Sequence, residues 1–176
     1  MGSNGRYLSR CSGCTSTIDN IDLAAAVDYT VTSRSIWTVF PIGINVGLQS
    51  DSGKFLARCD GCVRNSNEAM SAGVHANGYS WPNEQLTPVL CPNGKWALRA
   101  DTGKYLSICN YCVNGNNADL VFINVYDLND ARAQWTVTVV WWFIDLKFML
   151  NNKYYHNEPM LTRHINELVI LIMNSI

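Results

Sequence analysis

The chain has 176 residues, of which 48% are hydrophobic and 15% are charged, and its formal net charge at pH 7 is −1. This length suits one domain with a real core and is too short for two domains of comfortable size. The near-neutral charge, with no block of like charges, excludes the electrostatic footprint of proteins that bind nucleic acid or anionic membranes.

The first residues, MGSNGRYLSR, lack the apolar core of a signal peptide, which slightly favours a cytoplasmic location. The uninterrupted apolar run LVILIM, at residues 168–173, is far too short to cross a bilayer. We therefore predict no membrane span.

One ten-residue stretch occurs in three similar copies. The copies are GRYLSRCSGC at residues 5–14, GKFLARCDGC at residues 53–62 and GKYLSICNYC at residues 103–112. Their aromatic-Leu pairs begin at Tyr7, Phe55 and Tyr105, at intervals of 48 and 50 residues. Repetition at this period indicates one supersecondary unit written three times.

In chain order, each copy is followed by two apolar segments of strand character. The first is predicted at residues 21–29, 70–76 and 119–127, the middle one being the weakest. The second ends at residues 39, 89 and 137, with Trp37, Leu86 and Trp135 in the same slot. These three side chains are predicted to lie in the core.

A third segment leads into the next copy. Apolar and polar residues alternate around Leu48 and Leu98, and each segment enters a turn in which Gly53 or Gly103 supplies a positive φ. The equivalent position in the third unit is Leu146. Each unit is therefore predicted to contain four short strands.

Three such units, at about residues 5–46, 47–96 and 97–146, predict an all-β β-trefoil that forms a single domain over residues 1–150. Because the chain starts inside a hairpin turn, the first unit has no leading strand. We expect residues 141–149 to close the barrel beside the N-terminal hairpin, with Ile144 and Leu146 alongside it. Residues 151–176 are predicted to form a C-terminal tail of unknown role, irregular or helical over residues 162–173.

The segment GLQSDSGKFLARC at residues 47–59 and the strand QWTV at residues 134–137 resemble the fascin-like β-trefoils. The chain is most similar to plant actin-cross-linking-like proteins and more distantly to amaranthin-type agglutinins, over residues 5–146. The resemblance implies the trefoil fold, and it implies either lectin-like recognition or actin binding. Fascin bundles actin with four trefoils, so one trefoil would bind filaments without bundling them unless it dimerised.

Six of the seven cysteines form three Cys-x-x-Cys pairs, Cys11/Cys14, Cys59/Cys62 and Cys109/Cys112. The pairs lie too far apart in a trefoil to share a zinc ion, so no metal site is predicted. No helix follows any pair, which disfavours a thioredoxin-like site. Local disulfides and free thiols both remain open, and Cys91 is expected to be an unpaired thiol.

The chain shows no catalytic set that is expected to converge. Its three histidines, His75, His156 and His164, are scattered, so we predict neither an enzyme nor a cofactor. The expected function is a lectin-like binding module for glycans or a protein surface, and the alternative is a fascin-like actin-binding scaffold.

The predicted binding loops are residues 15–20, 63–68 and 113–118, because loops on a rigid barrel carry function. The aromatic residues Tyr79, Trp81 and Tyr111 fall in neighbouring loops, where they could stack on a sugar or pack against the barrel. The candidate ligand-binding residues are Asp60, Arg64, Ser66, Tyr79, Trp81, Asn110, Tyr111 and Asn114.

Overall fold

The computed structural model describes residues 3–115, 119–139 and 170–174. Within these ranges the chain is built from strands and four single-turn 3₁₀ helices, which confirms the all-β prediction. None of the described helices is long and apolar enough to cross a membrane. The strands are β1 (Tyr7–Cys11), β2 (Asp22–Asp28), β3 (Ile36–Ile42), β4 (Asn45–Gln49), β5 (Phe55–Asp60), β6 (Met70–Ala76), β7 (Thr87–Leu90), β8 (Trp96–Arg99), β9 (Tyr105–Cys109), β10 (Leu120–Val125), β11 (Thr136–Val139) and β12 (Ile170–Asn174), and the helices are η1 (Ile18–Asn20), η2 (Ser33–Ser35), η3 (Pro82–Glu84) and η4 (Ala131–Ala133).

The predicted tight turns form between β4 and β5 and between β8 and β9. Gly53 and Gly103 have φ of 77° and 80°, values that residues with a side chain rarely adopt. Each glycine N–H donates to the carbonyl three residues earlier, at 3.0 Å from Ser50 and 2.9 Å from Ala100. The two turns are therefore built alike, as their sequences are.

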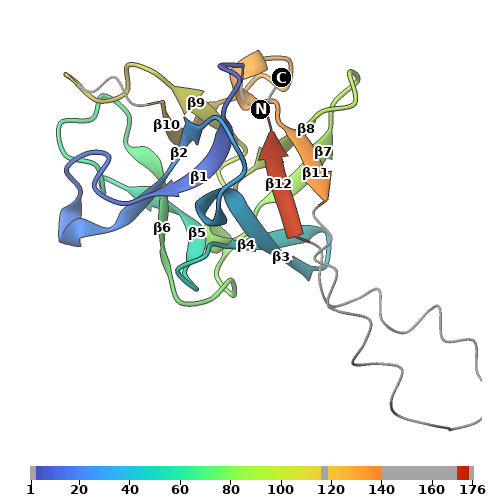
Figure 1. Ribbon diagram of the computed structural model, residues 1–176, viewed down its shortest axis with the longest axis horizontal. Coiled ribbons are helices and arrows are strands. Elements are labelled where there is room, and N and C mark those ends of the chain that lie inside the picture. The colour runs from blue at the N-terminus through green and yellow to red at the C-terminus, as the bar shows by residue number, and fades with distance from the viewer. Residues whose placement is uncertain (1–2, 116–118, 140–169, 175–176) are drawn as a thin grey trace, which may run out of the picture.

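The strands form one curled sheet in which the pairings recur in threes (Figure 1). Antiparallel pairs β1–β2, β5–β6 and β9–β10 follow the three sequence copies. Strands β2, β6 and β10 also pair with one another at one end of the molecule. This end carries the loops that follow the Cys-x-x-Cys pairs, so the three loops are brought together.

The place beside the N-terminal strand is filled by β12. Its residues pair with β1 (Tyr7 opposite Asn174), with β3 (Trp37 opposite Leu171) and with β11 (Val139 opposite Leu171). Figure 1 shows β12 running alongside β11 and close to β1. A strand from residues 170–174 thus pairs beside β1.

This placement corrects the prediction for the C-terminus. The expected closing segment, residues 141–149 with Ile144 and Leu146, lies outside the described residues. Residues 170–174 form a strand, whereas an irregular or helical tail was expected from the sequence. Short apolar runs do not distinguish strand from helix by periodicity, and the β-branched Ile170 and Ile172 favour the strand.

The core contains the residues that the repeat predicted. Trp37, Trp135, Leu8, Leu56 and Leu106 are at most 1% exposed. Both indole N–H groups donate to backbone carbonyls at equivalent places, to Leu8 at 3.0 Å and to Leu106 at 3.1 Å. Each tryptophan therefore contributes a large apolar surface without leaving its polar atom unsatisfied.

Two repeats also share an ion pair between a strand and the following hairpin turn. The guanidinium of Arg10 contacts Asp51 at 2.6 Å, and that of Arg58 contacts Asp101 at 2.8 Å. The third repeat has the buried Ile108 in place of the arginine. The hydrogen bonds from Arg10 hold the pKa of Asp51 below its ordinary value of 3.8.

We expect the Arg10→Gln variant to lose less stability than the wild type when the pH is lowered. Because the pKa of Asp51 is lowered in the folded state, its stabilisation is present above pH 3.8 and is lost as pH falls through the lower folded pKa. Between about pH 5 and pH 2.5 the wild type should therefore lose about 1 kcal/mol more than the variant, measured by denaturant unfolding. The control is Arg64→Gln. Because Arg64 forms no ion pair within the described chain, the pH profile of this variant should match that of the wild type. Identical profiles for wild type and Arg10→Gln would contradict the prediction.

Candidate functional site

The three predicted binding loops interlock through their backbones. The N–H of Ile18 donates to the carbonyl of Cys62 at 2.8 Å, which joins the first loop to the second. The N–H of Asn67 donates to the carbonyl of Cys112 at 2.7 Å, which joins the second loop to the third. These backbone bonds hold the loops against one another.

Each Cys-x-x-Cys pair lies at the base of one loop, with its sulfur atoms at disulfide-bonding distance. The Cα atoms are 5.8, 5.7 and 5.6 Å apart in the three pairs, within the usual range for a disulfide. Such short rings remove little chain entropy, so their main effect is to stiffen the loops. The pairs, in chain order, are Cys11–Cys14, Cys59–Cys62 and Cys109–Cys112.

Of the two alternatives that the sequence left open, the structure therefore supports local disulfides. Cys14 in particular is not a free thiol, because its sulfur lies at bonding distance from that of Cys11. Cys11 ends β1 and is buried, whereas Cys14 lies in the turn beyond the strand and is half-buried against the same apolar cluster. Cys91 is buried and unpaired, as predicted, and burial raises the pKa of its thiol.

The first and third pairs differ in their surroundings. Cys109 and Cys112 line a polar cavity, whereas Cys14 lines neither that cavity nor the other polar cavity described below. The equivalence of the three pairs in the sequence thus extends to their bonding but not to a ligand site. Cys14 is a structural residue that closes the first loop, and the candidate site belongs to the third.

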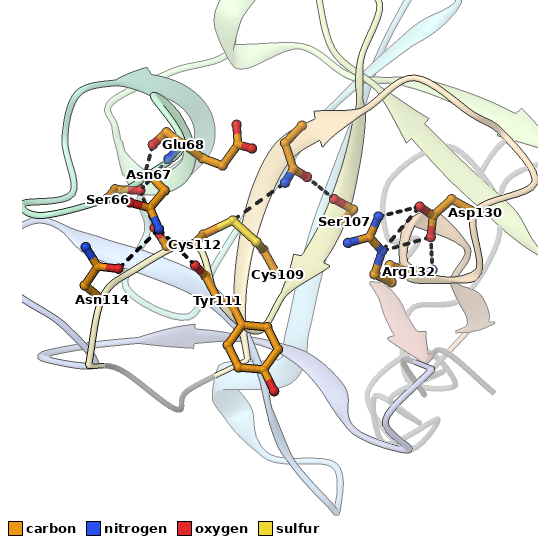
Figure 2. The surroundings of a disulfide bond; sticks show 11 residues. Ser66, Asn67, Glu68, Ser107, Cys109, Tyr111, Cys112, Asn114, Asp130 and Arg132 are labelled. Carbon is orange, nitrogen blue, oxygen red and sulfur yellow. Dashed lines mark hydrogen bonds and ion pairs between the residues drawn. A yellow bond between two sulfur atoms is a disulfide. The ribbon is translucent and has the colours of Figure 1, made fainter.

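The cavity over the third pair, the Tyr111 cavity, is concave, has a volume of about 390 Å³ and exposes both polar and apolar atoms. Figure 2 shows the Cys109–Cys112 disulfide in the middle, with Asn67 and Asn114 on one side and Arg132 on the other. The residues that line the cavity are Ser3, Asn4, Asn67, Glu68, Cys109, Asn110, Tyr111, Cys112 and Arg132.

Tyr111 is the most exposed aromatic side chain of the described chain. It sits between the two cysteines, its side chain is 85% exposed, and in Figure 2 its ring points away from the disulfide. A rigid loop that presents a bare aromatic ring beside a polar cavity loses little entropy on binding. The aromatic face is therefore available to a ligand.

The amide of Asn67 connects this aromatic residue to the neighbouring loop. Its Nδ2 donates to the backbone carbonyl of Tyr111 at 3.4 Å and to Oδ1 of Asn114 at 3.2 Å. Beside it, the Ser66 hydroxyl donates to the carbonyl of Cys112 at 2.9 Å. These bonds fix the orientation of the amide, so this wall of the cavity is preorganised.

On the other side of the disulfide, Arg132 pairs with Asp130 at 2.6 Å. The hydrogen bond between them lowers the pKa of Asp130 and raises the pKa of Arg132. The cavity also contains Glu68. Because Asp130 neutralises Arg132 and Glu68 adds a negative charge, the site has no excess positive charge.

The structure thus brings together four of the eight predicted ligand residues. Asn110 and Tyr111 line the cavity, while Ser66 and Asn114 support it from the neighbouring loops. Two further lining residues, Asn67 and Arg132, were missed in the sequence. Asn67 was inside a predicted loop, and Arg132 precedes a strand of the same repeat, but only the fold places the two beside one cysteine pair.

The other four predicted residues lie elsewhere. Asp60 is in an ion pair with Arg58, and Arg64 lines a different cavity. Trp81 is 70% exposed, just before η3, and does not line the Tyr111 cavity. These residues form no single site with Tyr111.

Tyr79 proves to be a packing residue. Its ring lies 5.2 Å from that of Phe40 and 5.1 Å from that of Phe55, measured between ring centroids. Together with Ala57 and Ala76, the three rings form a small apolar cluster. The structure therefore supports, for Tyr79, the packing alternative that the sequence left open.

Catalytic and metal chemistry were not expected. His75 is partly buried and its pKa is lowered by that burial, while His156 and His164 lie outside the described residues. No cluster of three potential metal ligands occurs within the described ranges. That the protein is not an enzyme stays a prediction.

No protein-family model matches the sequence, and a search of curated proteins finds no match. Among solved structures, the chain is similar to a designed threefold-symmetric protein, ThreeFoil, with a TM-score of 0.52 and 18% identity, covering 73% of this chain and 95% of that one. A Caenorhabditis elegans protein of unknown function gives a TM-score of 0.53 and 16% identity, covering 72% and 84%.

A third similar structure is a Polyporus squamosus lectin bound to the influenza-binding epitope Neu5Acα2-6Galβ1-4GlcNAc. Its TM-score is 0.50 at 12% identity, and the match covers 79% of this chain and 51% of the lectin chain. At such identities the likeness concerns the fold alone, and it supports an all-β, trefoil-like architecture. The resemblance to fascin-like and amaranthin-type proteins stays a prediction, and these structures give no support to actin binding.

Proposed function

We propose that the protein is a non-enzymatic, lectin-like binding module that recognises a neutral glycan segment at the Tyr111 cavity. The observation that carries the proposal is the bare Tyr111 ring beside a concave polar site of about 390 Å³. A sugar ring has an apolar C–H face and a polar edge of hydroxyls. An aromatic face and fixed amide groups suit these two surfaces.

The charge of the cavity favours a neutral sugar. Arg132 is neutralised by Asp130, and Glu68 adds a negative charge, so an anionic ligand would meet repulsion with little compensation. Asn110 offers an amide donor and acceptor for hydroxyl groups, and Asn67, whose two N–H donors bond to Tyr111 and Asn114, offers its Oδ1 as an acceptor. The lectin in the set of similar structures binds a glycan, which is consistent with the same use of this architecture.

A closed three-repeat trefoil, with β12 as the strand that completes the barrel, is part of this proposal. The pairing of β12 with β1, β3 and β11 supports this arrangement. A closed barrel has no free sheet edge and holds the three predicted binding loops, the cap loops, rigidly. Rigid loops let a shallow site bind without a large ordering cost.

We expect Tyr111→Ala to weaken glycan binding by about tenfold or more, since exposed aromatic anchors contribute about 1.4 kcal/mol or more. The wild type would be screened on an array of neutral and acidic oligosaccharides that includes Galβ1-4GlcNAc. Titration calorimetry with the best neutral hit would then compare the variants. The matched control is Trp81→Ala, which removes another bare aromatic ring outside the cavity. No neutral hit, or an equal loss for both variants, would refute the proposal.

A further inference from the structure

A second polar cavity, of about 560 Å³, lies between the first cap loop and the second. Among the described residues it shares no lining residue with the Tyr111 cavity. Hydroxyl groups and one arginine dominate it, and its described lining contains no aromatic ring. The residues that carry the argument are Ser12, Thr15, Ser16, Asn20 and Arg64.

The guanidinium of Arg64 is largely unused by the protein. Its Nε donates to the carbonyl of Thr17 at 3.4 Å, and its two terminal NH₂ groups have no acceptor among the described residues. A guanidinium carries five donors in a planar fork that matches oxyanions. Most of the hydrogen-bonding capacity of Arg64 is therefore free for a ligand.

Three hydroxyl groups of the same cavity are also unused. Ser12, Thr15 and Ser16 make no side-chain hydrogen bond within the described part of the chain, whereas the Thr17 hydroxyl donates to the carbonyl of Ile21 at 3.0 Å. Free hydroxyl donors beside an arginine form a set that suits the oxygen atoms of an anion.

The cavity carries an uncompensated positive charge. Arg64 is the sole charged residue of its described lining. Asp19 adjoins the lining residue Asn20 in the sequence but neither lines the cavity nor pairs with Arg64, while Asp22 pairs with Arg10 at 2.8 Å and Asp60 pairs with Arg58. This charge state contrasts with that of the Tyr111 cavity, which contains Glu68.

The backbone around the cavity is held in an unusual conformation. Asp19, Asn20 and Asn65 have φ of 55°, 52° and 57°, and they are the non-glycine residues with positive φ in the described chain. Asp19 belongs to the same loop but is not part of the lining. Asn and Asp adopt this left-handed conformation more readily than other non-glycine residues, and of the three only Asn20 lines the cavity. The N–H of Arg64 also donates to the carbonyl of Ser16 at 3.0 Å, which ties its backbone to the opposite wall.

We propose that this cavity binds a tetrahedral oxyanion, the sulfate or phosphate monoester group of a ligand, through the Arg64 fork and the hydroxyls of Ser12, Thr15 and Ser16. This site does not depend on the neutral-glycan function of the Tyr111 cavity.

The test is a backbone amide NMR titration of the full chain with inorganic sulfate and phosphate at constant ionic strength, with chloride as the reference. We expect saturating shifts at residues 12–20 and 64 for both oxyanions, and binding weakened by about tenfold in Arg64→Gln, as expected for a charge-assisted pair. Arg64→Lys should retain part of the affinity, because it keeps the charge without the fork. Arg34→Gln, which removes an exposed arginine elsewhere, should bind like the wild type.

Titrations with N-acetylglucosamine 6-sulfate and glucose 6-phosphate then identify which ester is preferred, and saturation by either supports the site. Shifts that chloride reproduces, no saturable binding, or equal affinity in wild type and Arg64→Gln would overturn it. Galβ1-4GlcNAc carries no anion and tests the Tyr111 cavity alone. Failure of one proposal is therefore distinguishable from failure of the other.

Discussion

Replacing Trp37 by alanine lowers the free energy of unfolding by about 3–5 kcal/mol. The indole is fully buried in the shared core, where a truncation leaves a cavity that the surrounding strands cannot fill. The change also leaves the carbonyl of Leu8 without the hydrogen bond that the indole N–H donates at 3.0 Å. Urea unfolding followed by circular dichroism measures the loss.

The matched control is Trp81→Ala, in which an equally large side chain is 70% exposed. Its effect should be within about 0.5 kcal/mol, as for surface substitutions elsewhere. A loss below about 1 kcal/mol for Trp37→Ala would mean that the repeated tryptophan slot is not a core position. Equal losses of stability in Trp37→Ala and Trp81→Ala would also contradict the assignment of Trp37 to the core.

Ending the chain after Val169 should abolish the cooperative unfolding transition. The truncation removes β12, and with it the partners of β1, β3 and β11 at three places in the sheet. Three strands would be left with unpaired N–H and C=O groups, and exposed edges of this kind also promote aggregation. We expect a loss greater than the roughly 5–15 kcal/mol that holds a typical domain together, so the folded state should not be populated.

The control truncation ends after Asn174 and keeps every described residue of β12. It should unfold with the midpoint of the full chain in the same urea titration. A second variant, Leu171→Pro, leaves the length unchanged, but it disrupts a strand residue that pairs with both Trp37 and Val139. If truncation after Val169 leaves a cooperative transition of unchanged midpoint, β12 does not complete the sheet.

The sequence was informative wherever it repeats. Equivalent positions such as Trp37 and Trp135 share one environment, because repeated units stack on a common core, and their burial could be predicted. The turns at Gly53 and Gly103 were equally predictable, because a positive φ restricts the choice of residue.

Features that occur once were harder to predict. The strand at residues 170–174 has no repeat partner in the sequence, and its short apolar run does not reveal which strands it pairs with. The side chain of Tyr79 looked like a loop aromatic, yet long-range contacts with Phe40 and Phe55 bury it in part. The neighbourhood of Asn67 and Arg132 likewise depends on how distant loops meet.

The cysteine pairs show what sequence spacing can predict and what it cannot. Their equal spacing allowed local disulfides in all three repeats, but spacing alone could not decide between a bridge and two thiols. Nor could it reveal that Cys112 borders a cavity while the equivalent Cys14 does not, because the lining is supplied by residues from other loops.

The glycan site is tested most directly by an amide NMR titration of the isotope-labelled full chain with the best neutral hit of the oligosaccharide array. The predicted result is saturable shifts at Asn67, Asn110 and Tyr111, none at residues 12–20, and saturation at about tenfold or more higher sugar concentration in Tyr111→Ala. Shifts confined to another surface, or no shifts at millimolar sugar, would contradict a glycan site at the Cys109–Cys112 loop.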